Sequence, residues 1–141
     1  MKKLLSFTLL ICIALSCSLL FTACNKTASA NATIVYSSET MVVIKVDEVS
    51  GNATLIHALD SVKGDNFNYE ISGGMITSVN GVQNKADWSF SWMLYTNDAD
   101  FSNTTWGTVT YNQMTFGSAT LGAQDLPVAS GFYYILNYTS F

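Results

Sequence analysis

Apolar residues at alternating and helical spacings divide most of the chain into strands around one helix. Residues Met41 to Val46 are rich in β-branched side chains, and alternate positions fall on one face, which is typical of a strand. From Ala53 to Lys63, apolar residues share one side at helical spacing, and Gly64 is placed to end the helix. These apolar residues are Leu55, Ile56, Leu59 and Val62. The pattern therefore predicts one helix over residues 53–63.

The most regular alternation of apolar and polar residues runs from Trp88 to Tyr95. It predicts a strand with Trp88 and Trp92 on one face and Tyr95 on the other. Asn80-Gly81 is a strong signal for a tight turn. Other strands are predicted near Thr33 and at residues 67–71, 75–79, 106–111, 114–116 and 132–138. One helix packed on a mixed sheet of five to six strands is an α+β domain.

The beginning of the chain has the pattern of a bacterial secretory signal. A basic start, Met1-Lys2-Lys3, precedes an uncharged apolar stretch from Leu4 to Ala23. This stretch ends in Phe21-Thr22-Ala23-Cys24, which resembles the lipoprotein processing box, where a small residue precedes the cysteine that receives the lipid. An uncleaved membrane anchor is the alternative, because the apolar stretch is about as long as a spanning helix requires.

Cleavage before Cys24 divides the chain into three parts. We expect a signal peptide at residues 1–23, a lipidated Cys24 within a flexible tether at residues 24–36, and one domain at residues 37–141. Cys12 and Cys17 fall within the signal peptide, so no disulfide is expected in the mature chain. The domain is then held at the cell membrane by its lipid and faces outside the cytoplasm.

The charge of the mature chain excludes two classes of partner. Four lysines against ten acidic side chains leave residues 24–141 with a formal net charge of −6, and the chain contains no arginine. Nucleic-acid binding requires a clustered basic face, and bidentate clamping of phosphate or carboxylate requires guanidinium groups. We therefore expect no nucleic-acid partner.

The order of four short strings resembles the C-terminal domain of the transcobalamin and intrinsic factor family, with its bacterial stand-alone lipoprotein members. The strings lie at residues 52–59, 75–82, 92–97 and 131–138. The resemblance covers roughly Thr40 to Phe141. It implies a β-grasp-like fold, in which the helix lies across a curved mixed sheet. It also implies that the ligand is a small molecule, with a corrinoid as the first candidate.

Aromatic side chains are the candidate ligand-binding residues. An apolar surface that also offers hydrogen bonds suits planar ligands, sugars or partner surfaces. The alternative is that the strand aromatics form the core under the helix, which we favour for Trp92. Trp106 and Tyr111 lie near predicted loops and are better placed for a surface role. The full set is Trp88, Trp92, Tyr95, Trp106, Tyr111 and Phe116.

Two other groups carry incomplete chemical motifs. His57, the only histidine, could pair with Asp60 one helical turn later, but no nucleophile motif accompanies the pair. The loop from Asn97 to Asn103 has alternating oxygen ligands, as calcium sites do. It lacks the glycine and the glutamate that an EF-hand loop requires. We therefore expect no enzyme and no resident metal or cofactor.

The sequence predicts a membrane-anchored, non-enzymatic module that binds a small molecule by shape and stacking. The alternative is an adhesion or assembly module that binds a protein or a glycan through the same aromatic face or an exposed sheet edge. A concave pocket favours the first function, and a flat patch or a self-pairing edge favours the second.

Overall fold

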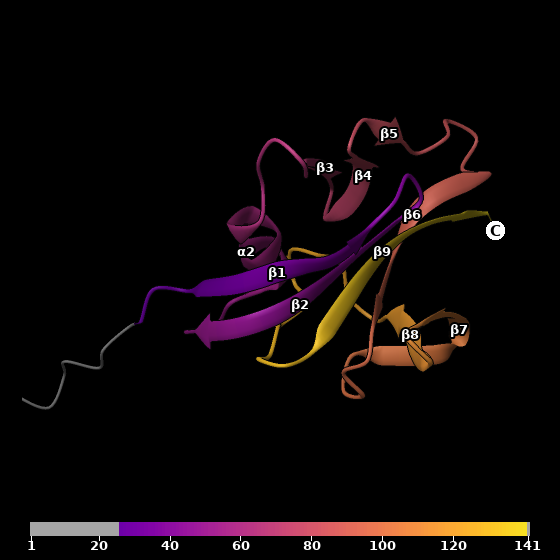
Figure 1. The fold of residues 1–141 in the computed structure, drawn as a ribbon. Helices are drawn as coiled ribbons and strands as arrows, with labels where there is room; N and C mark the ends of the chain where they lie inside the picture. The colour runs from indigo at the N-terminus through magenta and orange to yellow at the C-terminus, as the bar shows by residue number, and fades with distance from the viewer. Residues whose placement is uncertain (1–25, 141) are drawn as a thin grey trace, which may run out of the picture.

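In the computed structural model, which describes residues 26–140, antiparallel strands form two sheets (Figure 1). The larger sheet has the spatial order β1 (Ser29–Ser37), β2 (Met41–Ser50), β9 (Tyr133–Ser140), β6 (Phe90–Thr96), β8 (Met114–Ala119) and β7 (Ser102–Tyr111). The smaller sheet consists of β3 (Tyr69–Ser72), β4 (Met75–Val79) and β5 (Val82–Gln83). Helix α2 (Leu55–Ser61) follows β2.

The predicted fold class, an α+β domain with a β-grasp-like mixed sheet and one packed helix, is wrong. Strands account for 57% of the described residues and helix for 6%, so the fold is mainly β. All strand pairs in both sheets are antiparallel. Antiparallel neighbours can be joined by short hairpins, whereas a mixed sheet needs long crossovers between its parallel strands. Four of the strand pairs join consecutive strands as hairpins, namely β1–β2, β3–β4, β4–β5 and β7–β8.

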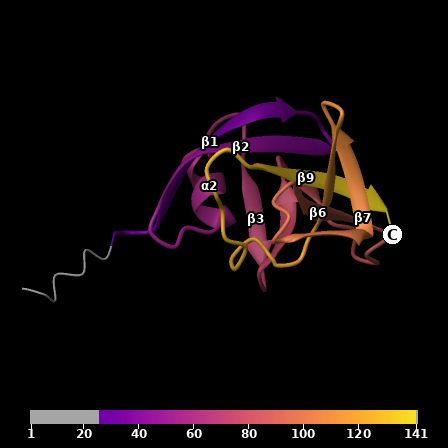
Figure 2. The ribbon, with the colours of Figure 1, turned by 90° about the horizontal axis from the view of Figure 1, so that it is seen from below.

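Helix α2 forms where the apolar spacing predicts it, but it is too short to lie across a sheet. It has seven residues, with Leu55 and Leu59 fully buried. The helix lies beside β1 at one end of the molecule, and β7 lies at the other end (Figures 1 and 2).

Part of the predicted tether is a strand. Within residues 24–36, the chain from Ser29 onward belongs to β1 and pairs with β2. The inward positions of β1 include Ala30 and Ala32, and alanine is depleted in strands, so the alternation there is a weak signal. The predicted signal peptide and Cys24 lie outside the described residues. Among residues 26–140, no helix is long and apolar enough to cross a membrane.

The larger sheet buries side chains on both faces. On β2, the side chains of Val42, Ile44 and Val46 share one face of the strand, as predicted. They lie in the main core, to which α2 and the smaller sheet also contribute. Val43 lies in a second core on the opposite face. Figure 1 shows the smaller sheet and the β7–β8 hairpin on opposite sides of β2, β9 and β6. The hairpin therefore covers the face that carries the second core.

The first and last strands of the larger sheet meet at one corner. The rings of Tyr36, on β1, and Tyr111, on β7, lie 5.7 Å apart between centroids. The Tyr111 hydroxyl also lies 3.5 Å from the Val35 carbonyl oxygen. The sheet is therefore strongly curved, as the β7–β8 hairpin folds back toward β1.

Two buried tyrosines make the fold sensitive to alkaline pH. The Tyr134 hydroxyl accepts the Ala129 N–H at 3.2 Å, and burial of the side chain raises its pKa to about 12. The Tyr69 hydroxyl donates to Asp60 Oδ1 at 2.8 Å. Burial, and then this carboxylate, raise the pKa of Tyr69 as well. Both side chains are therefore held neutral in the folded state at a pH where an ordinary tyrosine ionises.

We expect the free energy of unfolding to fall as the pH rises above about 10. In this range Tyr69 and Tyr134 ionise in the unfolded chain but stay neutral in the folded one, so rising pH favours unfolding; for Tyr134 the effect extends to about pH 12. Urea unfolding at a series of pH values measures it. A Tyr134→Phe variant should lose less stability at high pH. Stability that stays level well above pH 10 would contradict the expectation.

Candidate functional site

An apolar pocket of about 300 Å³ lies at the edge of β6, where β6 and β8 diverge. β6 pairs with β8 only at Tyr95 and Thr96. The preceding residues, 91–94, line one side of the pocket, and residues 119–122 line the other. Side chains alternate between the two faces of a strand, so a cavity that touches four consecutive residues must lie along the strand edge. The pocket occupies this gap in the sheet.

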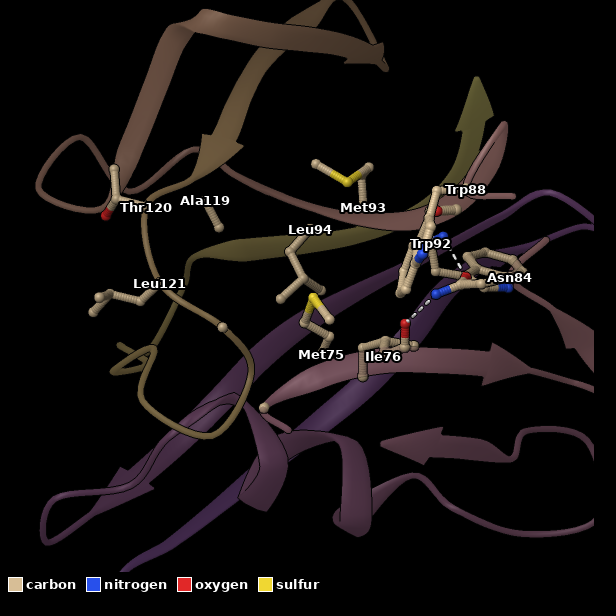
Figure 3. A pocket seen from close by; sticks show the side chains of 13 residues that line it. Met75, Ile76, Asn84, Trp88, Trp92, Met93, Leu94, Ala119, Thr120 and Leu121 are labelled. Atoms are coloured by element: carbon tan, nitrogen blue, oxygen red, sulfur yellow. Dashed lines mark hydrogen bonds between the residues drawn. The ribbon is translucent and has the colours of Figure 1, made fainter. Parts of the chain in front are cut away.

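The third wall of the pocket is the start of the smaller sheet. Gly74, Met75 and Ile76 contribute to it. A Cβ on Gly122 would lie 2.7 Å from the Gly74 carbonyl oxygen, so only glycine allows the chain after β8 to approach this wall so closely. In Figure 3, Met75 and Leu94 point toward each other, with the two tryptophans at one end and Leu121 at the other.

Asn84 joins the two sheets beside the pocket. Its Oδ1 accepts the Trp92 N–H at 2.8 Å, and its Nδ2 donates to the Ile76 carbonyl at 3.0 Å (Figure 3). The neighbouring Lys85 N–H donates to the Phe90 carbonyl at 2.9 Å. These bonds satisfy backbone groups of β6 that face away from β9. They therefore also obstruct pairing of another strand with this part of the edge.

Trp88 lines the pocket from a strained position. Its φ is +62°, in the left-handed region that bulky residues rarely adopt, and 52% of the side chain is exposed. The Trp88 N–H donates to the Lys85 carbonyl at 2.9 Å, which closes a tight turn. In hairpin loops with this geometry the residue after the turn is usually glycine. Strain of this kind is found preferentially at functional sites.

The loop around Trp88 is held by its neighbours. Asp87 Oδ1 accepts both the Ser89 hydroxyl at 2.7 Å and the Ser89 N–H at 3.0 Å. These hydrogen bonds, led by that from the hydroxyl, lower the pKa of Asp87. The backbone of the loop is therefore fixed on both sides of the indole.

Large apolar side chains surround the mouth of the pocket. Met75, Trp88 and Leu121 are each between 41% and 52% exposed, and all three line it. None of the described lining residues carries an ionisable side chain. The lining set is Gly74, Met75, Ile76, Asn84, Trp88, Ser91, Trp92, Met93, Leu94, Ala119, Thr120, Leu121 and Gly122. This arrangement can bind an apolar group.

The structure brings two of the six predicted ligand-binding residues to the pocket. Trp88 and Trp92 line it, although Trp88 precedes β6 and does not share a strand face with Trp92. Trp92 is also a core residue, as favoured from the sequence, because it is 5% exposed and its indole N–H donates to the Val82 carbonyl at 2.7 Å. No flat platform of all six aromatics exists among the described residues.

The other four predicted residues lie elsewhere. Tyr95 and Phe116 are buried in the second core, so they are structural. Tyr111 packs on Tyr36 at the corner of the sheet. Trp106 is on the surface, 64% exposed on β7, but does not line the pocket. The curved sheet separates these residues between two cores and the surface, so the structure does not bring all six together at one site.

The remaining lining residues had no distinctive sequence signal. Met75 and Leu121 are single apolar residues next to glycines, and Ser91 is a polar residue in an alternating strand. Asn84 follows a short strand as an ordinary loop residue would. Only the positive φ of Trp88 marks the site strongly, and φ is not visible in the sequence.

His57 and Asp60 do not form a base and its orienting group. His57 Nδ1 accepts the Thr54 N–H at 3.1 Å, at the start of α2. The Asp60 carboxylate accepts the Tyr69 hydroxyl. His57 is therefore part of a helix cap.

The oxygen-rich loop at residues 97–103 uses its side chains to hold its own backbone. Asn97 Oδ1 accepts the Tyr133 N–H at 2.9 Å, and Asp98 Oδ1 accepts the Asp100 N–H at 3.1 Å. Within residues 26–140, no three histidine, cysteine or acidic side chains are grouped as a metal site would need.

Comparison with family models, with curated proteins and with solved structures finds no match to this chain.

Proposed function

We propose that the domain is a non-enzymatic module that captures a small apolar molecule in the pocket at the β6 edge. The observation that carries the proposal is Trp88, a half-exposed indole that lines the pocket from a left-handed backbone position. A glycine at this position would remove the backbone strain but also the indole. The presence of tryptophan there therefore favours a role for the indole side chain. Met75 and Leu121 extend the apolar contact at the mouth.

The size of the pocket favours a compact ligand. Its volume of about 300 Å³ is at the lower end of the range for small-molecule pockets. A corrinoid, which the family resemblance suggests, is a large macrocycle, and only one of its peripheral groups would enter such a space. We therefore propose a smaller ligand and keep cobinamide as a competitor in the test.

An adhesion or assembly module is the second candidate. The observation that favours it is Trp106, which is exposed on an edge strand away from the pocket. Self-pairing at β6 is disfavoured, because Asn84 and Lys85 already bond its free edge at Trp92 and Phe90.

The proposed location follows from the sequence alone. A lipid on Cys24 would hold the domain at the outer surface of a bacterial membrane. The domain would lie close to that surface, because β1 begins only five residues after Cys24. The pocket would then take its ligand from outside the cytoplasm.

Titration of the purified protein with 1-N-phenylnaphthylamine tests the function. This neutral dye fluoresces when it leaves water, and we expect saturable binding of one dye per chain. A Trp106→Ala variant should bind equally well, since Trp106 lies outside the pocket. Competition by cobinamide would support the corrinoid. No saturation up to millimolar dye would contradict small-molecule capture and favour the adhesion module.

A further inference from the structure

A second cavity adjoins the apolar pocket. It also has a volume of about 300 Å³, and Asn84 and Trp88 line both cavities. The Asn84 amide is held by its hydrogen bonds to Trp92 and Ile76, so it is a fixed part of the boundary. The half-exposed Trp88 indole is the part of this boundary that reaches the surface. A molecule bound against the indole can therefore extend from one cavity into the other.

The second cavity, unlike the first, is lined by charged side chains. Glu70, on β3, and Lys85, which follows β5, bring one negative and one positive charge to it. The one ion pair within residues 26–140 joins Lys45 and Asp47. Neither charge at the cavity is therefore paired with another described side chain, and both are open to a ligand.

The turn before β6 places the Lys85 cation beside the indole. The Trp88 N–H donates to the Lys85 carbonyl, and the Lys85 N–H donates to the Phe90 carbonyl, both at 2.9 Å. A tight turn of this kind brings its first and fourth α-carbons within about 7 Å of each other. The cation and the indole are therefore carried by one closed turn, and Glu70 comes to the same cavity from the smaller sheet.

The two charges decide which polar group suits the second cavity. A group with a single charge would be attracted by one of the two side chains and repelled by the other. A group that carries both an ammonium and a carboxylate can pair with Glu70 and Lys85 together. The apolar pocket does not suit such a group, because the charges would lose their hydration there and find no ionisable partner among the described lining residues.

The apolar pocket sets the size of the rest of the ligand. A cavity of about 150 Å³ lined by apolar side chains binds benzene. The present pocket, at about 300 Å³, has twice that room. Two fused rings would fill it.

Building on the proposed function, we infer that the ligand is a zwitterion of the α-amino-acid type with an apolar side chain of about two rings. The rings enter the apolar pocket beside Trp88, the ammonium pairs with Glu70, and the carboxylate pairs with Lys85. An α-amino acid carries both charges on the carbon next to its side chain. This arrangement matches two adjoining cavities, one apolar and one with both charges.

Four ligands that share the indole ring separate these requirements. Indole has no charge, tryptamine has the ammonium, indole-3-propionate has the carboxylate, and L-tryptophan has both. In calorimetric titrations at low ionic strength, we expect L-tryptophan to bind about 2- to 5-fold more tightly than either ligand with one charge, as an exposed ion pair allows. This advantage should shrink at about 0.5 M salt, because salt screens exposed charges.

Two variants assign each charge of the ligand to one side chain. Glu70→Gln should weaken L-tryptophan and tryptamine by about 2- to 5-fold without weakening indole-3-propionate. Lys85→Gln should weaken L-tryptophan and indole-3-propionate by the same factor without weakening tryptamine. Glu39→Gln and Lys63→Gln are the matched controls. They remove the same charges outside both cavities and should leave all four affinities unchanged.

The possible results separate this inference from the proposed function. If the dye and all four indole ligands fail to saturate the wild-type protein, small-molecule capture itself is wrong. If the dye saturates it but L-tryptophan binds no more tightly than indole, the apolar pocket binds ligands and the zwitterion is wrong. Equal weakening of tryptamine and indole-3-propionate by each variant would overturn the assigned pairs. Indoxyl β-glucoside carries an uncharged sugar on the same rings, and tighter binding of it than of L-tryptophan would also overturn the inference.

Discussion

Replacing Asn84 with alanine is expected to lower the free energy of unfolding by about 2–5 kcal/mol. The change leaves the Trp92 N–H without its acceptor and the Ile76 carbonyl without its donor. Trp92 and Ile76 are 5% and 2% exposed, so water cannot easily replace either bond. Each buried polar group that loses its partner costs about 1–3 kcal/mol. Urea unfolding of the variant and the wild type measures the difference.

Gln83→Ala is the matched control for this variant. Gln83 precedes Asn84, and its side chain is exposed. The Tyr138 hydroxyl donates to the backbone carbonyl of Gln83 at 3.0 Å, and this bond does not involve the side chain that is removed. We expect its free energy of unfolding to stay within about 0.5 kcal/mol of wild type. If Asn84→Ala is as mild as this control, Asn84 does not hold the two sheets together.

Replacing Phe116 with alanine is expected to cost about 3–5 kcal/mol of stability, the usual cost of emptying a phenylalanine site in a core. Phe116 is fully buried in the second core, and its ring lies 6.5 Å from that of Tyr133 between centroids, edge to face. The loss would confirm that this aromatic supports the β7–β8 hairpin. Urea unfolding again gives the value.

Trp106→Ala removes a larger side chain and is the control for Phe116→Ala. Because Trp106 is 64% exposed, its loss should change stability by about 0.5 kcal/mol or less. A mild effect of Phe116→Ala together with a loss of dye binding would place Phe116 in the ligand site, against the structure.

The local elements were largely predictable from the sequence. The strand predicted at residues 75–79 is β4, and Asn80 and Gly81 after it have positive φ values of 50° and 84°, as a tight hairpin turn requires. The opposite faces predicted for Trp92 and Tyr95 are also confirmed, since one lies in the main core and the other in the second. Both predictions depend on spacing within one segment.

The fold class and the pocket were not predictable in the same way. Alternation shows which face a residue takes but not where pairing between two strands ends, and the pocket exists because β6 and β8 pair only at Tyr95 and Thr96. Its far wall depends on the contact between Gly74 and Gly122, which are distant in sequence. Trp88 continues the alternation of β6, yet it belongs to the turn before the strand.

Trp88→Gly tests the central claim most directly, because stability and binding should respond in opposite ways. Glycine relieves left-handed strain of about 1–2 kcal/mol, which offsets the lost contacts of a half-exposed indole. We expect the free energy of unfolding to be equal to wild type or higher, while affinity for 1-N-phenylnaphthylamine falls at least about tenfold. Unchanged affinity in a folded Trp88→Gly protein would contradict the account.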